Sequence, residues 1–224
     1  MSRTQRLGRF LRRHAWSVSL SGASTLSFLR LASELREREL DPFDEAAARL
    51  LADSRGRLDG PMLAFTQTGG LAGMMALCVI SAAILFALGK SKETAYVLSC
   101  GSGALFIGSV LKLVFQRERP GPSTLYMIAT PGSFSFPSGH AMGSTCVVGS
   151  LVIVAYALAL AWPWRAASTV AGVSYVLGVA VSRVYFGVHF PSDVLGGCLA
   201  GAAWVAAATG WFYPRLLPGE ASGS

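Results

Sequence analysis

Long apolar stretches separated by short polar segments make up most of this 224-residue chain. Five of them approach or exceed the roughly 20 apolar residues that a helix needs to cross the hydrocarbon core of a bilayer. They are residues 62–89, 93–115, 141–162, 166–186 and 192–213. The pattern predicts an all-α polytopic membrane helix bundle with five spans.

A sixth apolar segment, residues 16–35, is weaker because serines and Arg30 interrupt it. Its composition fits an amphipathic helix at the membrane surface. A crossing helix would instead place the basic N-terminal arm on the same side as the basic residues that flank the other spans, as the positive-inside rule expects. Those basic residues are Lys90, Lys92, Arg165 and Arg215. We therefore expect a weak sixth span here.

Residues 36–61 alternate acidic residues and arginines around apolar positions. Asp41 followed by Pro42 is typical of a helix N-cap and first turn, so we expect an amphipathic surface helix beginning there. The chain is thus divided into an N-terminal region over 1–61, a membrane domain over 62–213 and a cytoplasmic tail over 214–224.

Composition supports a membrane protein, because only 14% of the residues are charged whereas soluble domains carry about 25%. The net charge of +7 could indicate nucleic acid, but much of the basic excess lies in the N-terminal arm without a recognition motif. We expect no nucleic-acid partner. The four cysteines lie in apolar segments and are expected to be small buried side chains, not disulfides or metal ligands. They are Cys78, Cys100, Cys146 and Cys198.

Consecutive spans are antiparallel, so the end of 93–115 and the start of 141–162 lie at one face of the membrane. The end of 166–186 and the start of 192–213 return to that face. Three polar motifs occupy these four ends, and the basic residues of the opposite ends place the motifs outside the cytoplasm.

The first motif is Lys112-x6-Arg119-Pro120. On a continuous helix, seven residues are two turns with about 20° of rotation, so Lys112 and Arg119 would face one site unless Pro120 has already ended the helix. Taken alone, the pair fits equally well two cations that reach from the helix to the interface. Arg117 is expected to be a solvated charge at the rim.

The second motif, Pro137-Ser138-Gly139-His140, precedes an apolar run and so begins a helix. The free N–H groups of a helix start bind anions, with Ser138 as a cap or phosphate ligand and Gly139 allowing close approach. Ordinary capping explains the Ser-Gly pair but not His140.

The third motif is Ser182-Arg183-x5-His189-x3-Asp193. Asp193 is placed to accept a hydrogen bond from Nδ1–H of His189, which would leave Nε2 unprotonated. Ser138 is a less attractive nucleophile, because no carboxylate nearby in sequence orients His140. The cationic side chains in the same cluster disfavour a metal site.

Together these motifs resemble the tripartite signature of the type 2 phosphatidic acid phosphatase superfamily, which also contains bacterial acid phosphatases and vanadium haloperoxidases. The match is complete at every motif position, over roughly residues 60–213. The resemblance implies that His189 forms a phosphohistidine, that Asp193 orients it, and that His140 protonates the leaving alkoxide and later activates water. The implied phosphate-binding residues are Lys112, Arg119, Arg183, Ser138 and Gly139.

The resemblance implies an integral plasma-membrane phosphatase that needs neither metal nor cofactor and hydrolyses a lipid phosphate or diphosphate, either phosphatidic acid-like or polyprenyl diphosphate-like. One alternative is a vanadate-dependent haloperoxidase, although those relatives are typically soluble. Another is a silent lipid-phosphate-binding protein, which would need the cations but not the histidines. The loop over 121–135 and the helix within 36–61 are expected to select the lipid, and the sequence does not indicate the oligomeric state.

Overall fold

The computed structural model describes residues 3–52, 56–120 and 134–214. These residues form eight helices and no strand, so they are all-α as predicted. The helices are α1 (Arg3–Arg36), α2 (Asp41–Ala52), α3 (Asp59–Thr68), α4 (Leu71–Ala87), α5 (Ser91–Phe115), α6 (Gly139–Ala157), α7 (Trp162–Tyr185) and α8 (Pro191–Phe212). The surface helix begins at Asp41, where the Asp-Pro pair predicts it.

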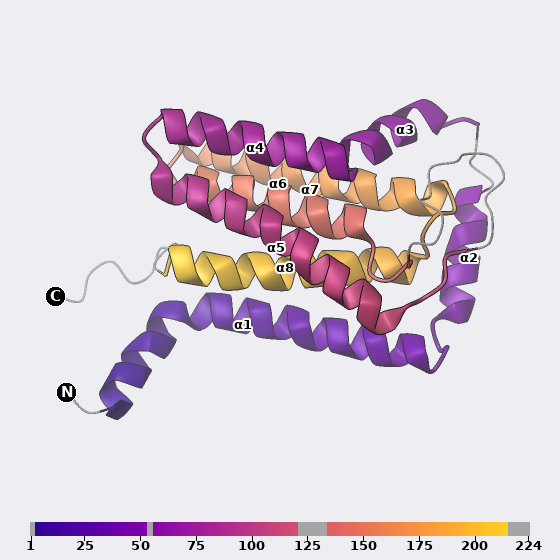
Figure 1. The fold of residues 1–224 in the computed structure, drawn as a ribbon, viewed down its shortest axis with the longest axis horizontal. Coiled ribbons are helices and arrows are strands. Elements are labelled where there is room, and N and C mark those ends of the chain that lie inside the picture. The colour runs from indigo at the N-terminus through magenta and orange to yellow at the C-terminus, as the bar shows by residue number, and fades with distance from the viewer. Residues whose placement is uncertain (1–2, 53–55, 121–133, 215–224) are drawn as a thin grey trace.

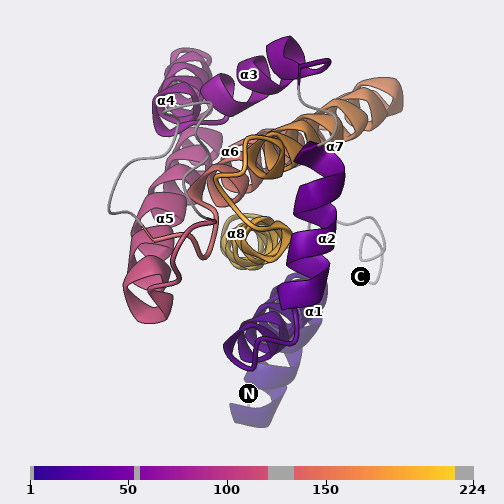
Figure 2. The ribbon, with the colours of Figure 1, turned by 90° about the vertical axis from the view of Figure 1, so that its right-hand side faces the viewer.

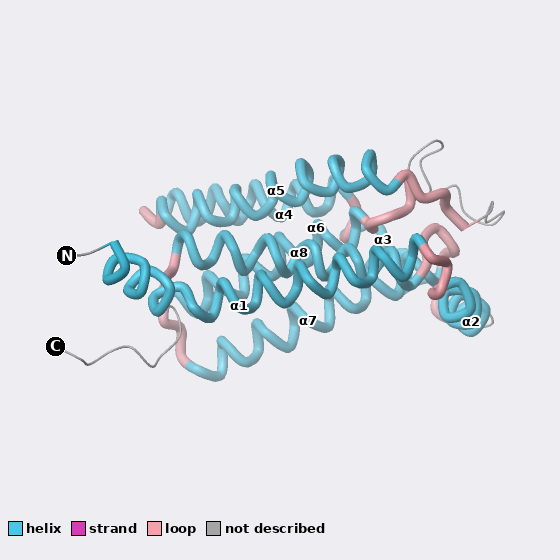
Figure 3. Tube along the Cα trace, turned by 90° about the horizontal axis from the view of Figure 1, so that it is seen from below, coloured by secondary structure: helices cyan, strands magenta, loops and turns pink. Residues whose placement is uncertain are grey.

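Helices α1 and α4 to α8 run side by side along the bundle, whereas α2 lies across one end (Figure 1). Seen from that end, α2 lies beside the start of α8 and runs between α1 and α7 (Figure 2). Viewed from below, α2 points towards the viewer beyond the ends of the other helices (Figure 3). The polar motifs lie at this same end, because α5 and α7 finish there and α6 and α8 begin there.

Four helices, α5 to α8, are long and apolar enough to cross a membrane, and the α3–α4 pair adds a fifth if it counts as one span. The prediction of one continuous helix over 62–89 was wrong, because α3 and α4 meet at an angle of 56°. The break falls at Gly69 and Gly70, and Gly70 has an extended backbone as the N-cap of α4. Two adjacent glycines favour a break, since glycine is among the weakest helix formers.

Helix α1 is not among the candidate spans, but it packs along α8. Its serines lie partly on the inner face: Ser17 and Ser24 are buried, and the Ser21 hydroxyl donates to the carbonyl of Ala203 at 3.0 Å. Large apolar side chains occupy its outer face, namely Val18, Leu20, Leu26 and Leu29. Two of the serines that lower the hydropathy of this segment are therefore turned inward, on the same helix as the buried Phe28 and Leu31, and its crossing of the membrane stays a prediction.

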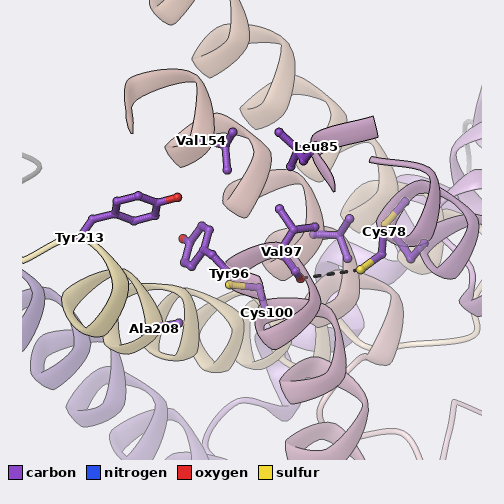
Figure 4. Close-up of a cluster of buried hydrophobic side chains, with 10 residues drawn as sticks. Cys78, Leu85, Tyr96, Val97, Cys100, Val154, Ala208 and Tyr213 are labelled. Carbon is purple, nitrogen blue, oxygen red and sulfur yellow. Dashed lines mark hydrogen bonds between the residues drawn. The ribbon is translucent and has the colours of Figure 1, made fainter. Parts of the chain in front are cut away.

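An apolar cluster around Tyr96 and Val97, both fully buried, packs the part of the bundle where α5 begins and α8 ends (Figure 4). The hydroxyl groups of Tyr96 and Thr209 lie 2.7 Å apart, which joins α5 to α8. All four cysteines are free; Cys78, Cys100 and Cys146 are buried, as predicted, and Cys198 is half-buried.

The Gly197-x-x-x-Gly201 pair brings α8 against α6. A Cβ atom on Gly197 would lie 2.5 Å from the carbonyl oxygen of Ser138, and one on Gly201 would lie 2.9 Å from Cβ of Thr145. Small residues allow such close helix contact. The start of α8 is thereby held directly against the start of α6.

Candidate active site

His189 lies between α7 and α8, and its side chain is 2% exposed. Its Nδ1 atom lies 3.4 Å from Oδ2 of Asp193, in the first turn of α8. The hydroxyl of Ser135 donates to the same Oδ2 and lies 3.2 Å from Nδ1. Ser135 can therefore accept a hydrogen bond from Nδ1–H while its own hydroxyl donates to the carboxylate, so that Ser135 and Asp193 together fix the imidazole.

Arg119 reaches His189 by a different route from the predicted one. Helix α5 ends at Phe115, and Gln116 turns the chain with a φ of +44°, so Lys112 and Arg119 are not on one continuous helix. Arg119 nevertheless donates from Nη1 to the carbonyl of Val188 at 2.8 Å and lies 3.2 Å from Nε2 of His189. The two-turn geometry was wrong, but the structure brings Arg119 to the site.

Burial disfavours the charged form of His189 and lowers its pKa to about 4, although the nearby carboxylate of Asp193 opposes this shift. Burial likewise lowers the pKa of Arg119, which the charge of Asp193 partly offsets. Arginine stays protonated in spite of such a shift. The site therefore combines a neutral imidazole with a fixed positive charge beside it, which suits attack on an anionic phosphate.

Two more cations surround the same space. Lys112, in the last turn of α5, donates to the carbonyl of Phe134 with one of its three N–H groups. Arg183, in the last turn of α7, is 1% exposed and donates to the hydroxyl of Thr66 on α3. Within the described part of the chain, the buried Nε of Arg183 has no hydrogen-bond partner. A buried polar group without a partner is costly, so this N–H fits a ligand oxygen.

The start of α6 provides a further unpaired donor. Ser138 is its N-cap, but the side chain makes no capping bond, and its buried hydroxyl has no partner among the described residues. The backbone N–H of Ser138 donates to the carbonyl of Asp193 at 2.9 Å, which ties the second motif to the third. The Ser138 hydroxyl is thus left for a ligand, as a phosphate-binding role requires.

His140 lies in the first turn of α6, within electrostatic range of Arg183 and His189. The break between α3 and α4 makes room for it, because a Cβ atom on Gly70 would lie 3.4 Å from Nε2 of His140. His140 therefore lies close to the cations and to His189, where it can exchange a proton with a group bound beside His189.

A cavity of about 330 Å³ opens from this cluster between α4, α5 and α6. Lys112, Gly139 and His140 line one part of it. The remaining lining is almost entirely apolar or small, including Met74, Val79, Leu98 and Leu105. A single ligand with a phosphate at one end and a hydrocarbon chain at the other would match both parts of this cavity.

The prediction that Arg117 is a solvated rim charge was wrong. Its side chain is only 15% exposed and forms ion pairs with Asp193 at 2.7 Å and Asp44 at 2.8 Å. Burial alone would lower the pKa of Arg117, but the two carboxylates outweigh it and raise the pKa. Sequence analysis missed this contact because Asp44 lies 73 positions away.

Sequence reasoning also missed Ser135, Thr66 and Asp44. Ser135 stands two residues before Pro137, and this proximity to the second motif was the only available signal. Thr66 lies inside an apolar run, and Asp44 resembles any acidic residue in the first turn of a surface helix. Neither Thr66 nor Asp44 is distinguished by its local sequence.

Comparison with known proteins agrees with this geometry. The family model described as the PAP2 superfamily matches residues 92–216. The chain belongs to the PAP2 superfamily. It is 34% identical over 178 residues to phosphatidylglycerophosphatase B of Bacillus subtilis, covering 77% of this chain and 84% of that protein.

Other relatives are named for different lipids. The undecaprenyl-diphosphatase of Sulfolobus acidocaldarius is 33% identical over 46% of this chain and 46% of its own length. The decaprenylphosphoryl-5-phosphoribose phosphatase of Mycobacterium tuberculosis is 32% identical over 54% of this chain and 63% of its own length.

A solved PAP2 structure shares the fold. The crystal structure of the transmembrane PAP2-type phosphatidylglycerolphosphate phosphatase from Bacillus subtilis aligns with a TM-score of 0.75 and 29% identity, over 86% of this chain and 95% of that chain. The present chain is accordingly an integral membrane protein of this superfamily.

Proposed function

We propose that this protein is a membrane phosphatase that hydrolyses the terminal phosphate of a lipid phosphate or diphosphate through a phosphohistidine. The observation that supports this most directly is the continuity between the cationic cluster and the apolar cavity beside Lys112 and His140. Concave sites with a few convergent polar groups are typical of ligand pockets.

In the first step, the lone pair on Nε2 of His189 attacks phosphorus, and the bond from phosphorus to the leaving oxygen breaks. His140 gives its proton to that oxygen. In the second step, His140 removes a proton from water, the hydroxide attacks phosphorus, and the P–N bond breaks to release inorganic phosphate and restore His189. Ser135 and Asp193 keep Nδ1 protonated throughout, so that the lone pair on Nε2 is available for the first step.

The transition state spreads negative charge over the equatorial oxygens of phosphorus. Lys112, Arg119 and Arg183 stabilise that charge, together with the hydroxyl of Ser138 and the N–H groups at the start of α6. The proposal that no metal or cofactor is needed rests on these donors, because they supply the positive charge that the transferred group requires.

The site is proposed to face the extracytoplasmic side of the plasma membrane. Lys90, Lys92 and Arg165 all lie at the opposite end of the bundle, where the positive-inside rule expects the cytoplasm. On this assignment 1–61 forms an N-terminal region with a sixth span in α1, 62–213 forms the membrane domain, and 214–224 is a cytoplasmic tail. The loop over 121–135 was predicted to select the lipid. Its residues 121–133 lie outside the described part of the chain.

The relatives favour a phosphomonoester on a glycerolipid, since phosphatidylglycerophosphatase B aligns with most of this chain. Polyprenyl phosphate and diphosphate relatives align with about half of it. We therefore place phosphatidylglycerophosphate-like lipids first among the substrates and polyprenyl diphosphates second.

The test measures phosphate release by the purified protein in detergent micelles from phosphatidylglycerophosphate, phosphatidic acid and a polyprenyl diphosphate, with and without EDTA. We expect turnover of at least one lipid, unaffected by EDTA and abolished by vanadate and by His189→Ala. The matched control is His14→Ala, because His14 is close to Gly210 at the other end of the bundle. Binding of these lipids without phosphate release would instead identify a silent binding protein, and inhibition by EDTA that added magnesium reverses would exclude the metal-independent mechanism.

A further inference from the structure

Asp44 is a buried carboxylate on α2, a helix that takes no part in the mechanism described above. Its side chain is 1% exposed. Oδ1 accepts the backbone N–H of Ser192 at 2.9 Å, and Oδ2 accepts the Ser192 hydroxyl at 2.5 Å and Nη2 of Arg117 at 2.8 Å. A buried carboxylate is costly unless donors compensate it, and here three donors do so.

Arg117 connects this carboxylate to the active site. Its Nη1 donates to Oδ1 of Asp193 and to the Ser192 hydroxyl, both at 2.7 Å. Its guanidinium carbon lies 4.2 Å from the centre of the Phe190 ring. A planar guanidinium held by two carboxylates and an aromatic face has little freedom to move. Oδ1 of Asp193 is thereby fixed, which leaves Oδ2 directed at Ser135 and His189.

We propose that Asp44 is a positioning residue for the reaction: by holding Arg117 and the first turn of α8, it orients Asp193 and, through Asp193, the nucleophile His189. This inference rests on the proposed function. The family model begins at residue 92, so Asp44 belongs to a part of the chain that the family motifs do not include.

The charge of Asp44 matters as well as its hydrogen bonds. Arg117 divides its positive charge between two carboxylates. Without the charge of Asp44, Arg117 would act on Asp193 alone and weaken it as an acceptor for the imidazolium that develops when Nε2 attacks. The effect should fall on the chemical step, because neither Asp44 nor Arg117 contacts the phosphate-binding groups Ser138 and Arg183.

The experiment compares Asp44→Asn with Glu45→Gln in the full-length protein. Glu45 is the next residue of α2, its side chain is 65% exposed, and its ion pair with Arg49 is long, at 3.8 Å. We expect Asp44→Asn to lower kcat about 10- to 100-fold, as small misplacements of reacting groups do. KM and competitive inhibition by inorganic phosphate should change less than about 2-fold, and Glu45→Gln should match the wild type.

Arg117→Lys supplies a second measurement, since lysine keeps the charge but lacks the planar fork. If Asp44 acts through Arg117, the double variant Asp44→Asn/Arg117→Lys should lose little more kcat than Arg117→Lys alone, whereas independent roles would give additive losses. Ser192→Ala covers the case in which Asp44→Asn does not fold, and we expect it to lower kcat about 3- to 10-fold, because the Ser192 hydroxyl donates to Asp44 and accepts from Arg117.

An unchanged kcat in Asp44→Asn would overturn the proposal, and so would additive losses in the double variant. A parallel loss of kcat, phosphate inhibition and thermal stability would assign Asp44 a purely structural role and would also overturn it. These outcomes all require an active wild-type protein. Failure of the wild type to release phosphate from any lipid would contradict the proposed function instead, so the two failures are distinguishable.

Discussion

Nη1 of Arg119 lies 3.2 Å from Nε2 of His189. An arginine has no acceptor and is always protonated, so this contact is favourable only when Nε2 bears a lone pair. The contact therefore fits a His189 with a lone pair on Nε2, as the proposed nucleophilic role requires. When phosphate binds, Arg119 is expected to transfer its hydrogen bond from Nε2 to a phosphate oxygen, which frees the lone pair at the moment it is needed.

We predict that His189 stays neutral well below the usual range for histidine. Burial lowers its pKa to about 4, against an ordinary value near 6.5, so the imidazole gains its proton only as the pH falls through about 4. The nucleophile is thus available at neutral pH and is lost in strong acid. NMR titration of the protein with isotope-labelled histidine, assigned with His14→Ala and His140→Ala, measures this directly. Protonation near pH 6.5 would contradict the prediction.

We predict that Ser135→Ala lowers kcat about 10- to 100-fold. The change removes a hydrogen bond to a charged group, worth about 1.5–3 kcal/mol, and frees the imidazole to rotate. The measurement is steady-state turnover on a soluble phosphate ester. Ser144→Ala is the matched control, because Ser144 is equally buried but donates only to Ala141 within its own helix. Equal activity of the two variants would remove Ser135 from the site.

We predict that His189→Ala forms no phosphoenzyme, whereas His140→Ala still forms one with a good leaving group. The proposed task of His140 is protonation, so its loss should matter most for alkyl phosphates and least for para-nitrophenyl phosphate. Rapid quenching with radiolabelled substrate checks both variants. An acid-stable label on Ser138 would show that the nucleophile is misassigned.

We predict that Ser102→Phe weakens the binding of long-chain substrates only. Ser102 lines the apolar part of the cavity, and a phenyl ring there would displace about two methylene groups, or about 1.6 kcal/mol of burial. KM for a long-chain lipid should rise about 10-fold and KM for a short-chain analogue should not. Val110→Phe introduces the same phenyl ring on α5 outside the cavity and serves as the control; a matching rise in that variant would argue against a chain-binding role.

We predict that α1 crosses the membrane. Single cysteines are introduced by Thr4→Cys, Lys90→Cys and Glu118→Cys into a protein without the four native cysteines, and intact cells are treated with a membrane-impermeant reagent. Only position 118 should react, because positions 4 and 90 lie at the end of the bundle opposite the site. Reaction at position 4 would mean that α1 does not cross, and reaction at 90 but not 118 would invert the whole topology.

Much of the site follows from sequence because its residues lie at helix ends. Antiparallel spans bring Lys112, Ser138, Arg183 and His189 to one end whatever the details of packing. The parts that failed depend on local backbone breaks. The chain changes direction at the bend between α3 and α4, at Gly69 and Gly70, and again at Gln116, whose backbone is in the left-handed region. The pattern of apolar residues does not predict the direction of either change.

Polar partners distant in sequence could not be predicted for a different reason. Thr66 is paired with Arg183 across 117 positions, and Asp44 is paired with Ser192 across 148. Each is an ordinary residue in its own segment. Likewise, the serines of α1 lower its hydropathy, and only its packing against α8 shows that Ser17 and Ser24 face inward.

The pairing of the first two helices with the last one also constrains how the protein is made. Ribosomes release the N-terminus first, so α1 and α2 are synthesised long before α8, the helix against which α1 packs and to which Asp44 is bonded. Asp193 is itself in α8. A nascent chain interrupted before Pro191 therefore lacks both the partner of His189 and the anchor of α2. We therefore expect the proposed site to be completed only after α8 has been synthesised, when the last helix packs against the first.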